Sequence, residues 1–259
     1  MSSAAALPLR VLEYWLTQYR RVWRGTAITS VINPVLYLGA LGLGLGTLVN
    51  QTRGEPLGVP YLDFVAPGIL AATAMTVASI EASWPVLGSI KWTRQYYAML
   101  ATPLGPRDIM LGHQLFMTGR VASTSAIYLA IIAAFGGVES AWGILALPAC
   151  ILLGAAFTTP LAAYAATRES DAAFVPVNRF VIVPMFLFSG TFFPAEELPL
   201  PLEWVAYATP LWHGVELCRG LTLGTLDPLP ALGHVAYLLV FVVAGLFLAV
   251  RTYTARLRK

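Results

Sequence analysis

The sequence predicts an all-α membrane protein, a bundle of six membrane-crossing helices with both chain ends on the inner side. Of its 259 residues, 58% are hydrophobic and only 11% are charged, whereas a soluble domain carries about a quarter charged residues. The charges cluster between long apolar runs, and about 20 apolar residues suffice for one crossing. Basic residues also gather in alternate segments, as expected for the cytoplasmic flanks of membrane helices.

Six uncharged or nearly uncharged runs account for the crossings. In chain order they are residues 25–52, 64–80 with a continuation to 90, 112–135, 140–167, 180–195 and 228–250. The fifth run has only 16 residues, which is short for a membrane span. The number of crossings therefore depends on whether this run is accepted.

The distribution of basic residues favours six crossings. With an inner N-terminus, only Arg53 and Arg219 of the 16 basic residues fall on the outer side. Five or seven crossings would place the basic tail, residues 251–259, outside, against the rule that Lys and Arg concentrate in the cytoplasm. The sequence thus predicts a cytoplasmic segment 1–25, a transmembrane domain 26–250 and a cytoplasmic tail 251–259, in a plasma or inner membrane.

An outer segment, residues 193–226, is too apolar for a solvated loop and is interrupted by prolines. Because proline ends helices, we expect a broken, re-entrant or interfacial helical hairpin before the last crossing. A small external cap packed on the bundle is the alternative.

The N-terminal segment predicts an amphipathic helix at the inner interface. Its apolar residues at helical spacing are Leu9, Leu12, Leu16, Tyr19 and Trp23, and Trp15 and Trp23 suit the lipid headgroup layer. Both a simple anchor and a helix that transmits movement fit this pattern.

Glycines and isolated charges mark the spans. Gly39, Gly42 and Gly46 predict close packing against a neighbouring helix. Glu81 lies deep in the second span, where a charge needs a partner. We expect it to pair with Arg120 or Arg179; the alternative is a gate or a substrate contact.

The inner loop, residues 91–112, mixes aromatic residues, small residues and prolines. It predicts a short helix over residues 93–101, stopped by Pro103, that presents Met99 and Leu100 between Arg94 and Arg107. A soluble partner could dock on this helix, or the loop could simply pack under the bundle.

The sequence lacks the patterns of an enzyme. His113, His213 and His234 do not have metal-ligand spacing, Cys150 and Cys218 suggest packing residues, and no P-loop pattern occurs. No basic stripe suggests nucleic-acid binding. We expect this chain to bind no metal, nucleotide or other cofactor.

Three stretches resemble the membrane subunit of ABC-2 type ABC exporters (type V exporter-like). They are MLATPLGPRDIMLG in the inner loop, FLFSGTFFP at residues 186–194 and TPLWHGVELCRG at residues 209–220. The resemblance is closest to permeases of lipo-oligosaccharide (nodulation-factor) export and of daunorubicin-like drug export, including multidrug efflux.

The resemblance implies a dimer with a second permease subunit, identical or related, and a separate cytoplasmic ATP-binding subunit that holds ATP and Mg. The implied coupling loop comprises Arg94, Met99, Leu100, Ala101, Thr102, Pro103 and Leu104. Spans 1, 2 and 5 would line a path for a lipid-like, glycolipid or amphipathic drug substrate that moves outward. Candidate path or gate residues are Leu36, Leu43, Glu81, Met185, Phe188, Phe192 and Phe193. A secondary transporter of small molecules and a membrane-embedded enzyme are the alternatives.

Overall fold

The computed structural model describes residues 6–46 and 59–258, and within them every regular element is helical. Five helical stretches in this part of the chain are long and apolar enough to cross a membrane. They are α3 (Tyr61–Lys91), α5 (Pro106–Ala134), Ala141–Ala166 (η2, Ala141–Leu145, with α6, Ala146–Ala166), Asp171–Phe188 and α11 (Pro228–Leu257). The predicted all-α membrane class is confirmed. The other predicted crossing, residues 25–52, extends beyond the described residues, so the count of six stays a prediction.

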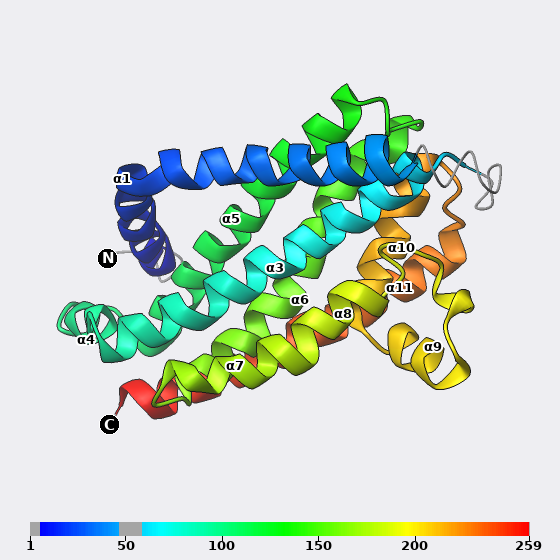
Figure 1. Ribbon diagram of the computed structural model, residues 1–259. Helices are drawn as coiled ribbons and strands as arrows, with labels where there is room; N and C mark the ends of the chain where they lie inside the picture. Colours follow the sequence, from blue (N-terminus) through cyan, green and yellow to red (C-terminus); the bar gives the residue numbers. More distant parts are fainter. Residues whose placement is uncertain (1–5, 47–58, 259) are drawn as a thin grey trace.

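The predicted N-terminal helix and first crossing form one continuous element. Helix α1 (Ala6–Tyr37) runs directly into the π-helix η1 (Leu38–Leu45). Figure 1 shows that α1 bends sharply, so that its first part lies across one end of the bundle and the rest runs along it.

The first part of α1 has a face packed on the protein in addition to the predicted apolar face. Val11 and Trp15 are buried, whereas Leu9, Leu16 and Trp23 are about half exposed. The reason is the shape of α5, where Gly112 leaves room for Val11 and His113 stacks on Trp15 with a ring separation of 3.9 Å. The expectation that Trp15 sits among lipid headgroups is therefore wrong.

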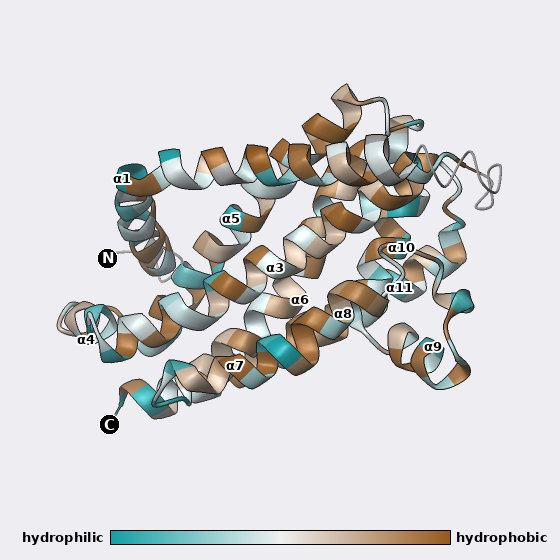
Figure 2. Cartoon of the chain, in the orientation of Figure 1, coloured by the Kyte–Doolittle hydropathy of each residue, from teal (hydrophilic) through white to brown (hydrophobic). Residues whose placement is uncertain are grey.

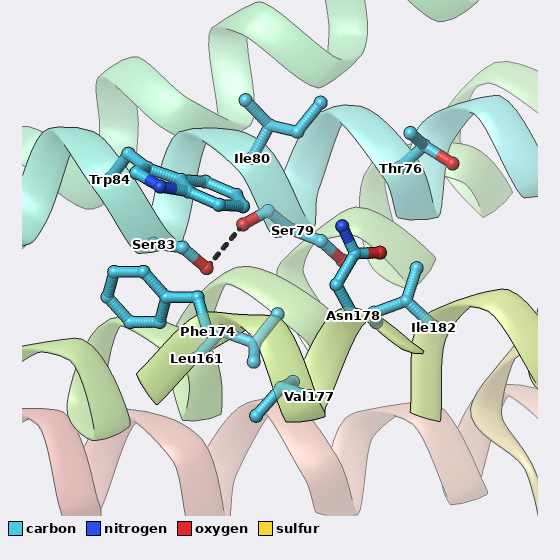
Figure 3. A pocket seen from close by; sticks show the side chains of 10 residues that line it. All are labelled: Thr76, Ser79, Ile80, Ser83, Trp84, Leu161, Phe174, Val177, Asn178 and Ile182. Atoms are coloured by element: carbon cyan, nitrogen blue, oxygen red, sulfur yellow. Dashed lines mark hydrogen bonds between the residues drawn. The ribbon is translucent and has the colours of Figure 1, made fainter. Parts of the chain in front are cut away.

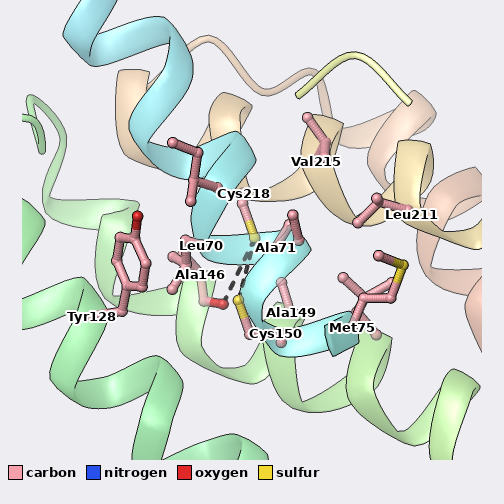
Figure 4. Packing of buried hydrophobic residues seen from close by; sticks show 14 of the residues in the cluster. Leu70, Ala71, Met75, Tyr128, Ala146, Ala149, Cys150, Leu211, Val215 and Cys218 are labelled. Carbon is pink, nitrogen blue, oxygen red and sulfur yellow. Dashed lines mark hydrogen bonds between the residues drawn. The ribbon is translucent and has the colours of Figure 1, made fainter. Parts of the chain in front are cut away.

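Helix α6 is the centre of the bundle and packs against α3, α5 and α11. Buried side chains form two clusters along it. We call the one that includes Leu211 and Cys218 the outer cluster, and the one that includes Tyr96 and Met99 the inner cluster. Figure 4 shows the outer cluster, in which Cys150 of α6 lies near Cys218 of α10 (Pro210–Leu223). Their sulfur atoms are 3.5 Å apart. Both cysteines are buried free thiols that pack in the core as expected, although the sequence did not predict that they touch.

The fifth span begins earlier than predicted. It consists of η3 (Asp171–Ala173), α7 (Phe174–Val177), the π-helix η4 (Asn178–Ile182) and α8 (Val183–Phe188). The predicted start after Arg179 is wrong, because Arg179 lies inside the helical stretch, where its side chain is exposed. The span ends at Ser189, before Gly190 with φ 76°, a backbone conformation that glycine adopts readily.

The outer segment folds into η5 (Ala195–Glu197), α9 (Leu200–Tyr207) and α10 (Pro210–Leu223). Helix α10 begins with the Thr209 side chain accepting a hydrogen bond from the Trp212 N–H at 3.3 Å and with Pro210 as its first residue, both common start signals. It packs against α3, α6 and α11. The predicted broken hairpin thus has two unequal helices, of which α10 belongs to the core.

Both described chain ends and α4 (Gln95–Leu100) lie at the same end of the bundle (Figure 1). Figure 2 shows that hydrophilic residues gather at this end, whereas the long helices are largely hydrophobic. We call it the inner end, and the end that holds α9 and α10 the outer end.

Candidate functional site

The helices predicted to line a path lie together on one face of the molecule. In Figure 1, α3 runs between the long part of α1 and the fifth span. Two cavities open beside α3, and Thr76 and Ile80 line both of them. We call this face, with its two cavities, the groove.

The first cavity lies between α3 and the fifth span (Figure 3). Its walls combine the hydroxyl groups of Thr76, Ser79 and Ser83 with apolar side chains and the Asn178 amide. Ser79 and Ser83 donate hydrogen bonds to the backbone oxygens of Met75 and Ser79, at 2.8 and 2.7 Å, so their hydroxyl oxygens remain available only as acceptors. The cavity can therefore receive an apolar group and offers an amide at its edge.

The second cavity lies between α1 and α3, and its walls carry more polar groups. The residues that line it are Ser30, Asn33, Pro34, Tyr37, Thr73, Thr76, Val77, Ile80, Arg120, Thr124 and Phe186. The groove as a whole thus offers both apolar and hydrogen-bonding surface, which suits an amphipathic molecule.

Most of the predicted path residues lie elsewhere. Leu36 is 63% exposed on α1, and Phe188 is exposed on α8, but neither lines the two cavities. Met185 packs partly against the outer cluster. The side chain of Leu43 lies outside the described part of the structure.

Glu81 is held by an ion pair with Arg120, which lines the second cavity. Arg120 Nε lies 3.0 Å from Glu81 Oε1. Arg120 Nη1 donates a hydrogen bond to the Tyr19 hydroxyl at 2.7 Å. The Arg120 guanidinium also lies over the Tyr19 ring, 4.5 Å from its centre. The predicted pairing of Glu81 with Arg120 is confirmed, and Tyr19 is a third member that the sequence did not reveal.

The outer end of the groove is bordered by residues 189–193, which we call the outer turn. Phe192 and Phe193 are half-buried in this turn. Phe192 packs edge-on against Phe186 of α8 with a ring separation of 5.3 Å, and its backbone oxygen accepts a hydrogen bond from Tyr61 of α3 at 3.3 Å. The turn is therefore attached to two of the helices that form the groove.

At the inner end, α4 confirms the short helix expected in the inner loop. It begins after Arg94, whose φ is 50°, an uncommon value for a residue other than glycine. Tyr96 and Met99 are buried in the inner cluster, whereas Tyr97, Ala98 and Ala101 are exposed.

The predicted apolar knob is therefore wrong for Met99. The helical period turns Met99 inward together with Tyr96, and Leu100 packs partly against the inner cluster. The exposed surface instead comprises Arg94, Tyr97, Ala98, Ala101, Thr102 and Pro103, which we call the α4 surface; Leu104 is half-buried beside it.

A cluster of three charged residues lies at the inner end, close to the start of α4. Glu169, in the turn after α6, binds both Lys91 at the end of α3 and Arg256 of α11. Hydrogen bonds from Arg256 and then Lys91 lower the pKa of Glu169 to about 2. These contacts join three helices at the inner end.

Gly39 and Gly46, two of the predicted packing glycines, are not the sites of closest helix packing among the described residues. A Cβ on Gly39 would meet no atom within 4 Å, and one on Gly46 would meet mainly its own helix and the Tyr61 side chain at ordinary distance. The surroundings of Gly42 lie outside the described part. Close approach occurs instead at Gly68, Gly112, Gly154, Gly214 and Gly245, where a neighbouring helix or turn meets the glycine.

No group of three or more His, Cys, Asp or Glu residues that could hold a metal ion occurs in residues 6–46 and 59–258. The polar groups of the groove are amides, hydroxyls and one satisfied ion pair. These groups can form hydrogen bonds with a molecule bound in the groove.

Comparison with known proteins agrees with this architecture. The family model of the ABC-2 type transporter matches residues 11–223. The chain is 32% identical to nodulation protein J of Rhizobium leguminosarum bv. trifolii over 99% of this chain and 97% of that protein. It is 31% identical to nodulation protein J of Rhizobium meliloti (strain 1021), over 98% and 96%. It is also 24% identical to the inner membrane transport permease YadH of Escherichia coli (strain K12), over 88% and 86%.

The family match covers the helices that line the groove, and the nodulation proteins match this chain over almost its full length. The groove, α4 and the outer turn all lie within the matched residues. This multi-pass membrane protein therefore belongs to the ABC-2 type transporter family.

Proposed function

We propose that this chain is the membrane subunit of an ABC exporter that moves a lipid-like, glycolipid or amphipathic drug substrate outward. A separate cytoplasmic ATP-binding subunit would bind ATP and Mg and dock on the α4 surface. The observation that carries this proposal is the position of α4, which displays an exposed face at the inner end while its other face is anchored in the core.

The proposed orientation has six crossings and both termini in the cytoplasm. It places the Lys91–Glu169–Arg256 ion pair and α4 on the side of the ATP-binding subunit. It also makes α9 and α10 an outer hairpin that partly re-enters the membrane, because α10 is buried among the long helices.

The proposed path is the groove, completed by a second permease subunit, identical or related. A single chain leaves the groove open, and both α1 and the fifth span display large exposed apolar residues beside it, among them Leu36 and Phe180. The mixed walls of the two cavities suit a substrate with an apolar part and hydrogen-bonding groups. The outer turn with Phe192 and Phe193 would close the path on the outer side.

Energy would pass from the partner through α4. Movement of a docked ATP-binding subunit would displace α4, and the buried Tyr96 and Met99 would carry this displacement to α5 and α11. The path would then alternate between inward-facing and outward-facing states.

The test is a charge placed on the exposed face of α4. We expect Ala98→Asp and Ala101→Asp to reduce co-purification with a candidate ATP-binding subunit at least ten-fold, because each replaces a small exposed side chain within the α4 surface. Substrate-stimulated ATPase activity should fall in parallel.

The matched control is Ala255→Asp, which adds the same charge to an exposed alanine at the inner end of α11. It should leave co-purification unchanged. Normal assembly and ATPase activity of both α4 variants would refute the proposed docking surface, and transport without any ATP-binding partner would favour a secondary transporter.

A further inference from the structure

Arg219 is one of the two basic residues that the predicted topology leaves on the outer side, and it is buried in the structure. It lies on α10, is 9% exposed and has its guanidinium over the ring of Phe64, 3.7 Å from the ring centre. Burying a charge is unfavourable unless it is fully paired and hydrogen-bonded. The partners of Arg219 therefore define its role.

The three partners of Arg219 belong to three different elements. Its Nη1 lies 2.9 Å from Glu216 Oε1 on α10 itself. Its Nε donates to the Phe64 backbone oxygen of α3 at 3.3 Å, and its Nη2 donates to the Gly190 backbone oxygen of the outer turn at 2.6 Å. One planar guanidinium thus joins α10, α3 and the outer turn.

The outer turn fits closely on α3 at the same place. A Cβ on Gly68 would lie 2.7 Å from the Thr191 backbone oxygen, so only glycine allows this approach. Ser189 and Thr209 share a hydrogen bond of 2.9 Å between their hydroxyl groups. The turn is therefore seated against α3 and α10 by close packing as well as by Arg219.

We propose that Arg219 is a positioning residue that holds the outer turn closed on α3, and we call its bonds to the Phe64 and Gly190 oxygens the outer clamp. The inference rests on the proposed function, in which the outer turn closes the path. If the turn moved away from α3, Arg219 would lose its bond to Gly190 while still buried, which is costly. The closed seat of the turn is therefore the favoured state, and opening requires input of energy.

A guanidinium is suited to this task and an ammonium is not. Arginine presents several N–H donors in a fixed planar fork, whereas lysine is a flexible point charge. Arg219→Lys should therefore keep the charge beside Glu216 but lose part of the outer clamp.

The competing explanation is that Arg219 only neutralises Glu216 within α10. The exchange Glu216→Arg with Arg219→Glu separates the two explanations. It restores an ion pair at the same spacing on α10 but removes the donors to both backbone oxygens. Under our proposal this double variant behaves like Arg219→Gln, and under the competing explanation it behaves like the parent.

The probe is Thr191→Cys in the full chain, with Cys150 and Cys218 replaced by alanine. Thr191 is fully buried and its hydroxyl has no hydrogen-bond partner in the described residues, so cysteine should fit with little disturbance. A membrane-impermeant maleimide is added from the outer side, to membranes without ATP, and the rate of labelling is measured.

We expect Arg219→Gln to accelerate labelling of Thr191→Cys at least ten-fold, and Arg219→Lys to have an intermediate effect. The control is Leu229→Cys, at the outer end of α11, where the parent Leu229 side chain is 81% exposed. This cysteine should be labelled at the same rate in all variants. If Arg219→Gln left the labelling rate of Thr191→Cys unchanged, the proposed outer clamp would be refuted. A labelling rate equal to that of the parent in the charge-exchange variant would refute it as well.

If Arg219→Gln does not accumulate, Phe64→Leu decides the question. It removes the ring beneath the guanidinium and keeps every hydrogen-bonding group, so we expect labelling two- to three-fold faster, and an unchanged rate again overturns the proposal. None of these measurements needs ATP or the ATP-binding subunit. The proposed outer clamp can therefore be refuted while the proposed docking on the α4 surface is supported, and the docking can be refuted while the clamp is supported.

Discussion

The two ends of the bundle use a short helix in opposite ways. At the inner end, only Tyr96 and Met99 of the six residues of α4 are buried. At the outer end, ten of the fourteen residues of α10 are buried. The inner helix is a surface element anchored by two side chains, and the outer helix is part of the core.

The charges follow the same division. Inner basic residues such as Lys91 and Arg94 are exposed, where water and salt screen them. Arg219 at the outer end is buried and depends on its protein partners. The inner end is thus built for an exchangeable partner, and the outer end for a defined arrangement of its own chain.

The largest effect that tests this contrast is expected at Met99. Met99→Asp should lower the free energy of unfolding by more than about 3 kcal/mol, because it removes a buried side chain and introduces a charge into the inner cluster. Thermal unfolding in detergent measures the change.

Ala98→Asp, one residue earlier on α4, is the matched control for that measurement. Ala98 is exposed, so its variant should unfold at nearly the temperature of the parent. Equal destabilisation by both substitutions would mean that α4 has no distinct inner and outer face.

A smaller effect is expected at the core contact of α10. A Cβ on Gly214 would lie 2.5 Å from a terminal carbon of Leu153 of α6, so Gly214→Ala should destabilise the protein by about 1–3 kcal/mol. Gly119→Ala on α5 is the control, because a Cβ there meets no atom within 4 Å and alanine favours a helix by up to about 1 kcal/mol. If both variants were equally stable, α10 would not be a tightly packed core helix.

The sequence predicted the helical class, the positions of most spans and the short helix α4, because hydrophobicity and proline act locally. The start of the fifth span was not predictable, because a charge such as Arg179 usually marks the end of an apolar run but here lies exposed inside the helical stretch. The burial of Met99 was also missed, because which face of a six-residue helix turns inward depends on neighbours distant in the sequence.

The contacts of the candidate site were less predictable for the same reason. The Glu81–Arg120 pair was among the options, because a deep charge requires a partner. Tyr19 and the carbonyl partners of Arg219 left no signal, since a hydroxyl or a backbone oxygen at long range has no sequence pattern. The cluster of Gly39, Gly42 and Gly46 predicted close packing, but a cluster of glycines in the sequence does not indicate which glycine contacts a neighbouring helix.

The smallest effect is expected at Glu169, which fastens the inner end through exposed ion pairs with Lys91 and Arg256. Its pKa is lowered to about 2 from the ordinary value of 4.5, chiefly by hydrogen bonds from Arg256 and Lys91. The unfolded chain therefore binds more protons than the folded chain between these two values, and the stabilisation is complete above about pH 4.5 and is lost as the pH falls toward 2. Glu169→Gln should lower the melting temperature slightly at pH 7, equally at pH 6, and progressively less below pH 4.5.

Added salt should reduce the same difference at pH 7, because exposed ion pairs are screened. Glu197→Gln, which alters an acidic residue exposed at the outer end, is the control and should show neither dependence. A Glu169→Gln difference that grows on acidification, or that persists in high salt, would mean that Glu169 is part of a core like that around Arg219. The two ends would then be held by the same kind of interaction, and their contrast would rest on the exposure of α4 alone.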